Sequence, residues 1–469
     1  MYKVYQKIIL ACLLLVMTGT VYSQRVTQTI NDGWKFSLFE GDASTADFDI
    51  SGWTDVSIPH TWNAKDADDE IPGYFRGKGW YRKLVTVEEM IPEQRVYLSF
   101  EGANQETNVF VNGTFVGNHK GGYSAFTFDV TDYVHAGRNL IAVSVDNSHN
   151  PDIAPLSADF TFFGGIYRDV YLVYTSPVQL STTHYASSGV YLKASKITDL
   201  QADISVKTFL SNALKSNQSL ILETEILDAD GNRVSLSQKK VNVKAEEKNV
   251  AFEALMTITQ PKRWDVDSPY IYKVYSRLKN KKEEVLDCVV NPLGIREYRF
   301  DAEKGFFLNG KYRKLIGTSR HQDYKGMGNA LRDEMHIRDV QLSKDMGSNF
   351  LRVAHYPQDP VVMQMCDKLG LLTSVEIPIV NAITQSRAFM DNCVEQATEM
   401  VYQNHNYPSV IIWAYMNEVL LRPPFNPDNK KERAEYMKSL HQIASAVEAQ
   451  IRSLNSERYT MLPCHSASQ

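Results

Sequence analysis

The sequence has few residues of the kinds that build metal clusters, disulfide frameworks and nucleotide sites. Its 469 residues include five cysteines, and four of them, Cys288, Cys366, Cys393 and Cys464, form no close pair. This spacing argues against a zinc site and a redox motif, so we expect four separate buried thiols. No HExxH, GxSxG or glycine-rich phosphate loop is present, which excludes the corresponding zinc-protease, serine-hydrolase and phosphate-binding patterns.

Strong charge of one sign and long hydrophobic runs are also missing. The net charge is −5 without a basic cluster, so we expect no nucleic-acid partner. The apolar stretch IILACLLLVM is too short to cross a bilayer, so we expect no membrane span. What is present is an ordinary composition, 43% hydrophobic and 22% charged, and the length predicts roughly two to four domains.

The first residues have the pattern of an export signal. Lys3 and Lys7 precede the apolar stretch, and TGTVYSQ follows it. A charged start, a short apolar middle and small residues near a cut site describe a secretory signal peptide. We predict a signal peptide over 1–23, with a secreted or periplasmic mature chain. The alternative is a lipoprotein cut at ILAC that lipidates Cys12, but only three apolar residues precede Ala11.

Two β-rich regions follow. Residues 24–179 hold runs such as WYRKLVTV and DVYLVY, and Asn112-Gly113 between two such runs is a strong hairpin signal. Many short strands with Gly and Asn turns predict a jelly-roll β-sandwich. Residues 180–294 continue with fewer aromatics, and SLILETEIL and RVSLSQKKVNVKA flank the turn DADGN. This second region predicts a smaller, immunoglobulin-like β-sandwich.

After residue 294 short apolar strands alternate with long helical segments. Such alternation predicts a parallel sheet, either open or closed into a barrel. An eightfold barrel has eight strands and eight helices, so we predict that 295–469 is the N-terminal part of a TIM barrel with about five of its eight strands. The expected strands are 313–317, 349–354, 371–377, 409–415 and 459–464, and the expected helices lie near 332–347, 359–369, 386–404 and 429–455.

Polar side chains follow four successive strands of this region, where each strand ends. The carboxyl ends of parallel barrel strands form one rim, and active sites of barrels are built there. A carboxylate-centred rim with amide, His and Arg neighbours suits sugar hydroxyls and glycosidic bonds. The candidate residues are Arg320 and His321 after the first strand, Arg352 and His355 after the second, Glu376 on the third, and Asn417 and Glu418 after the fourth.

Four motifs in this order resemble glycoside hydrolase family 2, and most closely its β-galactosidase branch. They are FFGGIYRDV, GTSRHQD, NFLRVAHYP and YPSVIIWAYMNE. The resemblance covers essentially the whole chain after the leader. It implies a sugar-binding jelly roll, an immunoglobulin-like sandwich and the start of a catalytic barrel.

The resemblance also implies a role for each candidate residue. Glu418 matches the general acid/base, the proton donor to the leaving group. Asn417 matches the neighbour that hydrogen-bonds the sugar 2-hydroxyl, and Arg352 would orient nearby carboxylates. The remaining substrate-binding candidates are His321, His355, Arg320 and Asp159, the last of which the first domain would extend toward the sugar.

Some positions depart from the family pattern. Ser319 stands where the family commonly has Asn, and SVEIPIVNA keeps Glu376 but lacks the Glu and His that supply magnesium in metal-dependent galactosidases. We therefore predict no magnesium site, no other metal at the rim and no cofactor. The family nucleophile lies on the seventh strand, which the sequence does not reach, so we expect this chain to be inactive alone.

The resemblance implies a retaining, exo-acting β-glycoside hydrolase, for which Asp159 favours a β-galactoside because an acidic group would repel a uronate. A β-glucuronidase or β-mannosidase of the same family remains an alternative, since the residues that separate these substrates fall largely beyond Gln469. A secreted, non-catalytic carbohydrate-binding protein is a further alternative. A homo-oligomer of the full-length form is left open.

Overall fold

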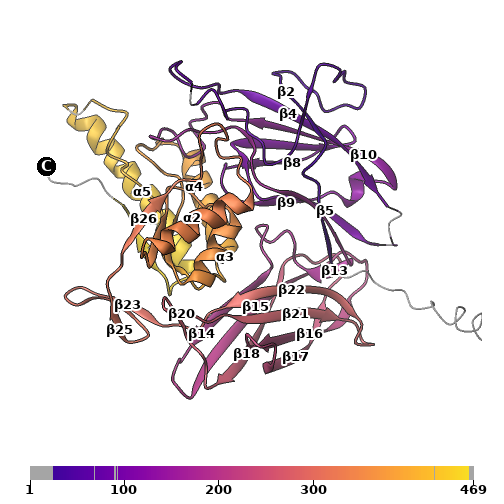
Figure 1. Cartoon of the computed structure of the whole chain (residues 1–469). Coiled ribbons are helices and arrows are strands. Elements are labelled where there is room, and N and C mark those ends of the chain that lie inside the picture. Colours follow the sequence, from indigo (N-terminus) through magenta and orange to yellow (C-terminus); the bar gives the residue numbers. More distant parts are fainter. Residues whose placement is uncertain (1–24, 68, 89–90, 92, 427, 464–469) are drawn as a thin grey trace, which may run out of the picture.

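The computed structural model of the chain describes residues 25–463 except 68, 89, 90, 92 and 427 (Figure 1). The predicted signal peptide over 1–23, with Cys12 inside it, and Cys464 lie outside these residues. In the described part of the chain, no helix is both long enough and apolar enough to cross a membrane. Cys288, Cys366 and Cys393 are free thiols, as expected, but only Cys366 and Cys393 are buried and Cys288 is half-buried.

The first body is a sandwich of two antiparallel sheets, drawn in indigo and purple in Figure 1. The sheet orders are β1-β12-β5-β9 and β3-β2-β4-β10-β7-β8, and β6 pairs with β11 beside them. Asn112 and Gly113 join β7 to β8 with φ values of 51° and 81°, the left-handed conformations that a tight hairpin turn requires. The elements are β1 (Val26–Thr29), β2 (Trp34–Leu38), β3 (Thr54–Val56), β4 (Lys78–Val87), β5 (Arg95–Phe100), β6 (Ala103–Asn104), β7 (Glu106–Val111), β8 (Thr114–Lys120), β9 (Phe126–Asp129), η1 (Thr131–Tyr133), β10 (Gly137–Asp146), β11 (Gly165–Ile166) and β12 (Val170–Thr175).

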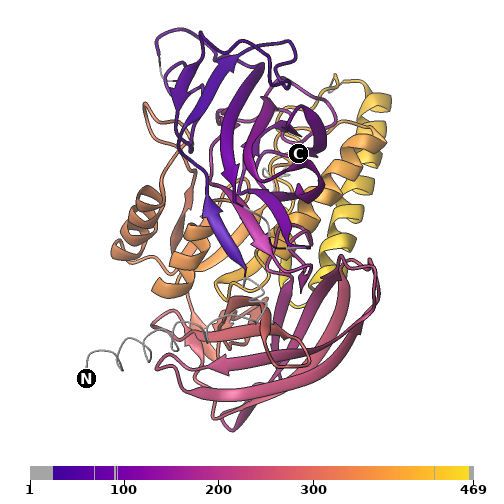
Figure 2. The ribbon, with the colours of Figure 1, turned by 90° about the vertical axis from the view of Figure 1, so that its right-hand side faces the viewer.

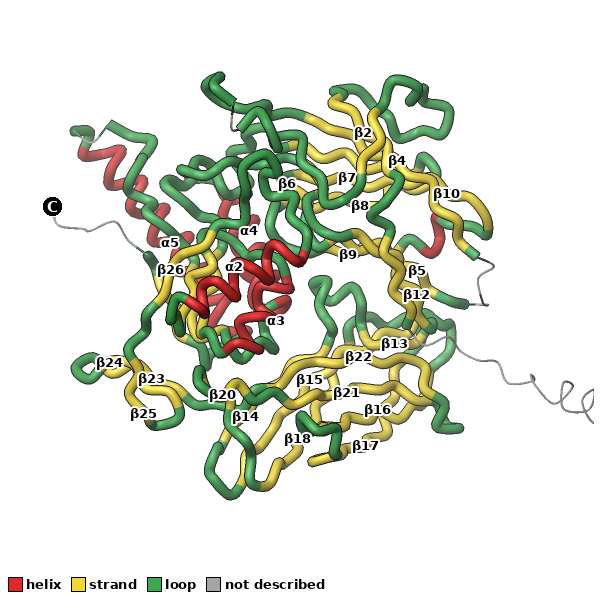
Figure 3. Tube along the Cα trace, viewed as in Figure 1, coloured by secondary structure: helices red, strands yellow, loops and turns green. Residues whose placement is uncertain are grey.

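The second body is a smaller sandwich. One sheet has β15 paired with β13, β14 and β18, and the other has the order β17-β16-β21-β22. Figure 3 shows its strands as two yellow layers below the rest of the molecule. The elements are β13 (Val178–Leu180), β14 (Val190–Ser195), β15 (Gln201–Asn212), β16 (Gln218–Leu227), β17 (Arg233–Val243), β18 (Val250–Thr259), β19 (Trp264–Asp265), β20 (Ser268–Pro269), β21 (Tyr272–Lys279) and β22 (Val285–Leu293).

A three-stranded antiparallel meander leads into the barrel. It consists of β23 (Tyr298–Asp301), β24 (Gly305–Leu308) and β25 (Lys311–Arg313). The first barrel strand, predicted at 313–317, is therefore placed too early: Lys311–Arg313 pairs with β24, and the first parallel strand begins at Gly317. The apolar segment between them does not form a strand.

The third body alternates five parallel strands with four helices. The strands lie in sequence order within one sheet, β26-β27-β28-β29-β30. The helix and later strand positions agree with the predictions to within two residues, except that the last strand, predicted to end at 464, ends at Met461. The elements are β26 (Gly317–Arg320), α2 (Asp333–Asp345), β27 (Phe350–Val353), α3 (Pro360–Leu369), β28 (Leu372–Glu376), α4 (Arg387–Gln403), β29 (Val410–Ala414), α5 (Lys430–Leu454) and β30 (Tyr459–Met461).

Local signals explain where the barrel helices begin and end. The Asp359 side chain accepts a hydrogen bond from the backbone N–H of Val361, and Pro360 occupies the first helical position of α3. Both features favour a helix start. Gly370 ends the same helix in the left-handed conformation with φ 70°, which glycine adopts without steric cost.

Helix α4 and the loop after it attach both sandwiches to the barrel. The side chain of Gln403 accepts from the backbone N–H of Ala125 in the first body and donates to its carbonyl. Asn406 accepts from the N–H of Leu192 in the second body. Figure 2 shows the barrel helices standing beside both sandwiches. The predicted fold class is confirmed: a jelly-roll sandwich, an immunoglobulin-like sandwich and part of a TIM barrel.

Candidate active site

Three strand ends bring an arginine, a glutamate and an asparagine together at the rim. Arg352 donates from Nε to Glu376 Oε1 at 2.5 Å and from Nη2 to Glu376 Oε2 at 3.2 Å. The same Nη2 donates to Asn417 Oδ1 at 2.8 Å. Glu376 is only 1% exposed, and a buried carboxylate needs such a partner. The sequence placed these residues on one rim, and in the structure they form one network.

His355 completes this network. Its Nδ1 lies 2.9 Å from Glu376 Oε2 and 3.3 Å from Arg352 Nη2; because a carboxylate oxygen accepts, we assign the shorter contact as a hydrogen bond donated by Nδ1. Glu376 thus receives hydrogen bonds on both oxygens, which holds its carboxylate and both donor side chains in fixed orientations.

Glu418 follows Asn417 with an unusual backbone conformation. Its φ is +53°, in the left-handed region that residues other than glycine seldom adopt. Its N–H donates to the carbonyl of Pro463 at 3.0 Å and its carbonyl accepts from Leu421. The Glu418 residue is partly exposed while Asn417 is 5% exposed. Strained positions of this kind are enriched at functional sites, and this one turns the chain at the end of β29.

The second histidine lies in an aromatic setting. His321 Nδ1 is 3.1 Å from the Tyr356 hydroxyl, and its ring centroid is 5.2 Å from that of His355 and 5.2 Å from that of Phe160. Burial, together with the charges of His355 and Arg352, lowers the pKa of His321 to about 4. The His321 ring is therefore neutral near pH 7.

The first body contributes to the rim through the loop that carries Asp159. Phe160 packs on His321, His355 and Tyr356, and Asp159 beside it is exposed. The charge of Asp159 acts on His321, whose pKa it raises against the stronger lowering by burial. The structure thus brings Asp159 to the edge of the histidine pair.

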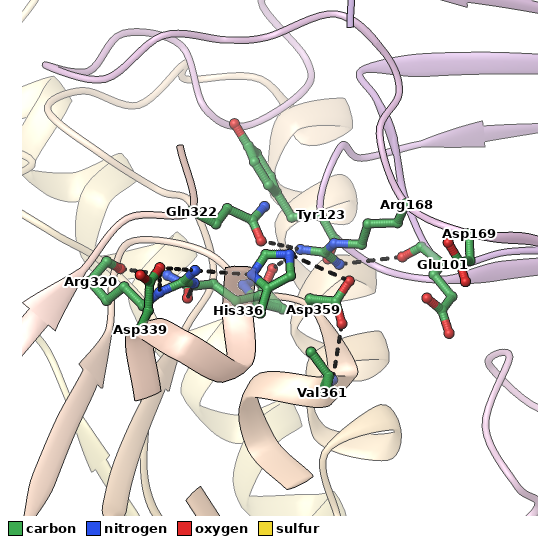
Figure 4. A network of polar contacts seen from close by, with 12 residues as sticks. Glu101, Tyr123, Arg168, Asp169, Arg320, Gln322, His336, Asp339, Asp359 and Val361 are labelled. Atoms are coloured by element: carbon green, nitrogen blue, oxygen red, sulfur yellow. Dashed lines mark hydrogen bonds and ion pairs between the residues drawn. The ribbon is translucent and has the colours of Figure 1, made fainter. Parts of the chain in front are cut away.

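Arg320 does not join the other candidates at the rim. Its guanidinium donates to Asp339 from Nε and Nη2, at 2.9 and 2.6 Å, and to Gln358 at 2.5 Å. Nη2 also lies 3.0 Å from Nδ1 of the buried His336. Figure 4 shows Arg320 beside Asp339, which lies on α2, with His336 on the other side. With every guanidinium nitrogen engaged, Arg320 supports the strand end rather than reaching toward a ligand.

Arg168 has a structural role that the sequence analysis did not predict. It lies in the FFGGIYRDV motif, is 3% exposed and crosses from the first body to the barrel (Figure 4). Its donors reach the carbonyl oxygens of Tyr123 at 3.0 Å and Pro357 at 2.7 Å, and Gln322 Oε1 at 3.2 Å. The signal available in the sequence was an arginine within an apolar, strand-like segment. Arginine is seldom buried without partners, so such a position indicates a residue that bonds to another part of the protein.

A stacked tyrosine pair was also missed. The rings of Tyr123 and Tyr356 stack with centroids 4.2 Å apart and an interplanar angle of 14°. Tyr123 comes from the first body and Tyr356 from the loop after β27, next to His355. No spacing rule pairs two aromatics so distant in sequence. Together with Phe160 they fix the first body against the rim.

Among the described residues, no three His, Cys, Asp or Glu side chains are grouped closely enough to hold one metal ion. The expected absence of a rim metal stays a prediction. What the rim offers is a carboxylic acid at Glu418, an oriented amide at Asn417 and two histidines. This set can donate a proton and hydrogen-bond a polyhydroxylated ligand.

Three family descriptions match consecutive parts of the chain. They are "Glycosyl hydrolases family 2, sugar binding domain" over 27–177, "Glycosyl hydrolases family 2" over 188–296 and "Glycosyl hydrolases family 2, TIM barrel domain" over 301–451. All three belong to one family and occur in its domain order, as the resemblance of the motifs predicts.

Individual proteins similar to this chain point to the same family. A β-glucuronidase of Bacteroides fragilis is 36% identical over 92% of this chain and 61% of its own length, and a β-galactosidase of Thermoanaerobacter pseudethanolicus is 34% identical over 84% and 51%. The crystal structure of a Bacteroides uniformis β-glucuronidase matches with a TM-score of 0.91 and 39% identity over 94% of this chain and 53% of its own. A calcium-binding mutant of B. uniformis β-glucuronidase 2, with two aspartates changed to alanine, matches with a TM-score of 0.88 and 38% identity over 94% and 53%.

The chain spans about half to three fifths of the length of these relatives. Within that span the domain order and the fold of all three bodies agree with those of the family and its solved members. The chain belongs to glycosyl hydrolases family 2.

Proposed function

We propose that the protein to which this chain belongs is a retaining, exo-acting β-glycoside hydrolase with Glu418 as its general acid/base. The observation that carries the proposal is the Asn417-Glu418 pair at the end of β29, held beside the Arg352–Glu376–His355 network. In this reaction the acid gives its proton to the departing glycosidic oxygen and then, as the base, activates a water.

Glu376 is not suited to be the second carboxylate of such a reaction. Both of its oxygens accept hydrogen bonds from Arg352 and His355, and it is almost fully buried. A nucleophile needs an oxygen free to reach the anomeric carbon. Glu376 therefore acts as a support for its donors. The expectation that the nucleophile lies on a later strand, and that this chain is inactive alone, remains part of the proposal.

For the substrate, we propose a β-glucuronide. The relatives with 35–39% identity that cover most of this chain include β-glucuronidases from Bacteroides fragilis and Bacteroides uniformis. A β-galactoside is the second candidate, favoured by Asp159 at the rim edge and by the galactosidase relative. Arg352 does not decide between them, because its charge is already matched by Glu376.

The test is an assay of the whole gene product, obtained by reading the gene past Gln469, on nitrophenyl β-glucuronide, β-galactoside and β-mannoside. We expect the wild type to turn over the nitrophenyl glucuronide, and E418Q to turn over methyl β-glucuronide about 10²–10⁴ times more slowly than the wild type. Preference for the galactoside would select the second candidate. Glycan binding by residues 25–294 without turnover of any glycoside by the whole product would replace the hydrolase with a carbohydrate-binding protein.

We also propose that the mature protein is exported. The pattern over residues 1–23 supports a cleavable signal. Expression of the whole gene with its own start, followed by N-terminal sequencing, should give a mature chain beginning at Gln24. A lipid-modified Cys12 would support the lipoprotein alternative.

A final proposal is that the protein binds a calcium ion through Asp333 and Asp359. The two aspartates changed in the calcium-binding mutant of the B. uniformis enzyme lie 26 positions apart (367 − 341), and Asp333 and Asp359 have the same separation (359 − 333). Their oxygens suit calcium, which takes six to eight oxygen ligands that include waters and carbonyls. Both residues lie at helix starts, Asp333 opening α2 and Asp359 capping α3.

A further inference from the structure

Arg168 of the first body bonds to both barrel loops that carry the rim histidines. Its Nη2 donates to the side-chain oxygen Oε1 of Gln322 at 3.2 Å and to the carbonyl oxygen of Pro357 at 2.7 Å. Gln322 follows His321 directly, and Pro357 lies two residues after His355. Figure 4 shows Arg168 extending from the first body toward Gln322. One nitrogen of the first body therefore holds a segment next to each histidine.

The other end of the same guanidinium is anchored in the first body. Nη1 donates to the carbonyl oxygens of Tyr123 at 3.0 Å and Glu101 at 3.3 Å, and the guanidinium carbon lies 5.1 Å from the ring centroid of Tyr167. Because Arg168 is 3% exposed, these hydrogen bonds lie in a region of low dielectric, where they are stronger than in water. The rigid fork of arginine lets one side chain bond in two directions at once. The first body thus sets the position of Nη2.

The two histidine loops are also linked to each other. Tyr356 lies between His355 and Pro357, and its hydroxyl is 3.1 Å from Nδ1 of His321. Its ring stacks on Tyr123 of the first body. The two imidazole rings lie 5.2 Å apart between centroids. A shift of either loop at its bond to the first body should therefore move both rings.

Resting on the hydrolase proposal above, we propose that Arg168 is a positioning residue, which sets from the first body where His321 and His355 stand at the rim. Arg168 is buried and does not reach the ligand, so it acts on the reaction through the two histidines. Asp159 and Phe160 lie at the rim themselves, whereas Arg168 connects the first body to the rim by a second and indirect route. Docking of the first body is then part of building the active site.

Exchange of the imidazole C2–H of each histidine, measured by mass spectrometry on the whole gene product, tests how the rings are held without requiring turnover. We expect R168K to speed this exchange at His321 and His355. Lysine cannot bond in both directions, and the buried acceptors that it leaves without a donor must move to recover a partner. The pKa of His321, which burial lowers to about 4, should rise toward about 6.5 as water reaches the ring.

The variant Q322L separates the two loops. It removes the acceptor next to His321 and leaves the bond from Arg168 to the carbonyl of Pro357. Exchange should therefore speed up much more at His321 than at His355.

The matched control is R82K. Arg82 is also a buried arginine of the first body, but its Nη1 donates to the carbonyl oxygens of Ala43 and Thr45, which belong to that same body. R82K should lower the Tm, because it removes buried hydrogen bonds, and should leave the exchange at both rim histidines as in the wild type.

Kinetics of the whole gene product on its preferred nitrophenyl glycoside supply the second measurement. R168K should lower kcat about tenfold with a smaller change in KM, since a misplacement of about 1 Å costs up to about 100-fold. R82K should keep the wild-type kcat at temperatures below its unfolding, because loss of stability alone does not change the rate of the folded enzyme.

Unchanged exchange at both histidines in R168K would overturn the positioning role, and so would faster exchange with a wild-type kcat. If the whole product cleaves no glycoside, the hydrolase proposal fails, and faster exchange in R168K but not in R82K would still support the positioning of the two rings by Arg168.

Discussion

Arg352 Nη2 lies 2.8 Å from Asn417 Oδ1, which fixes how the amide beside the proposed acid is turned. Because the oxygen of Asn417 accepts from a cation, its Nδ2 is directed away from Arg352. That nitrogen has no hydrogen-bond partner among the described residues. It is therefore free to donate to a sugar hydroxyl, which is the role that the family resemblance gives to Asn417.

Changing Arg352 to lysine should remove this orientation while keeping the charge. Lysine cannot reproduce the fork that reaches Glu376 and Asn417 together. We expect kcat of the whole enzyme to fall about 100-fold, the scale of a small misplacement near the reacting atoms, with a smaller change in KM. The control is R387K on α4, whose side chain is exposed and, among the described residues, forms an ion pair with Asp391 alone. Unchanged kinetics of R352K would contradict the role assigned here.

Changing Glu418 to glutamine should affect substrates according to their leaving groups. Glutamine keeps the shape but has no proton to give. We expect turnover of a methyl β-glycoside to fall by about 10²–10⁴, the usual contribution of a general acid, and cleavage of a nitrophenyl glycoside to suffer less in its first step. E435Q, at an exposed position of α5, is the control. Equal losses on both substrates would argue against proton donation.

The barrel helices could be predicted closely because their ends are marked locally. Asp359 and Gly370 bracket α3 within one short segment, and the apolar stripe of α5 is continuous. The first strand was misplaced because Lys311–Arg313 and Gly317–Arg320 lie close in sequence, and only pairing with β24 or β27 distinguishes them. Strand propensity cannot decide which of the two segments is the first barrel strand, because that depends on tertiary contacts.

The rim residues differ in how far the sequence could specify them. Arg352, Glu376 and Asn417 each lie at or just after the end of a predicted strand. Because parallel strands align their carboxyl ends, this placement predicted that the three residues share a rim. The same rule applied to Arg320, yet Asp339 on α2 draws its side chain away. The contact between Tyr123 and Tyr356 depends on how two bodies dock, and no pattern in either segment encodes it.

The half-buried His60, whose ring packs against Phe36 and Tyr81, predicts a pH dependence of stability. Burial lowers the pKa of His60 to about 4, against about 6.5 in the unfolded chain. Between pH ~6.5 and ~4 the unfolded chain therefore binds a proton that the folded one does not, and stability falls as the pH falls through this window. H60Q should remove this contribution, about 2 kcal/mol.

The measurement is urea unfolding of the chain at pH 7.5 and pH 4.5 for the wild type and H60Q. The wild type should lose more free energy of unfolding between the two pH values than H60Q does. Other groups titrate equally in both proteins and cancel in the difference. H135Q, at an exposed position of the same body, should follow the wild type. Parallel losses in the wild type and H60Q would show that His60 can be protonated while folded.

Two glycines that follow barrel helices allow a last prediction with an internal control. Gly347 after α2 and Gly370 after α3 both have positive φ, 89° and 70°. A Cβ on Gly347 would meet nothing within 4 Å, whereas one on Gly370 would lie 2.3 Å from the carbonyl oxygen of Val266. Both alanine variants are destabilised by backbone strain, by about 1 kcal/mol, but only G370A must also displace a backbone segment. Val266 lies in the tight β19–β20 turn, which cannot shift without disturbing the join between the second body and the barrel. We expect thermal unfolding of the chain to show a clearly larger loss of Tm for G370A than for G347A, and equal losses would mean that this join is loosely packed.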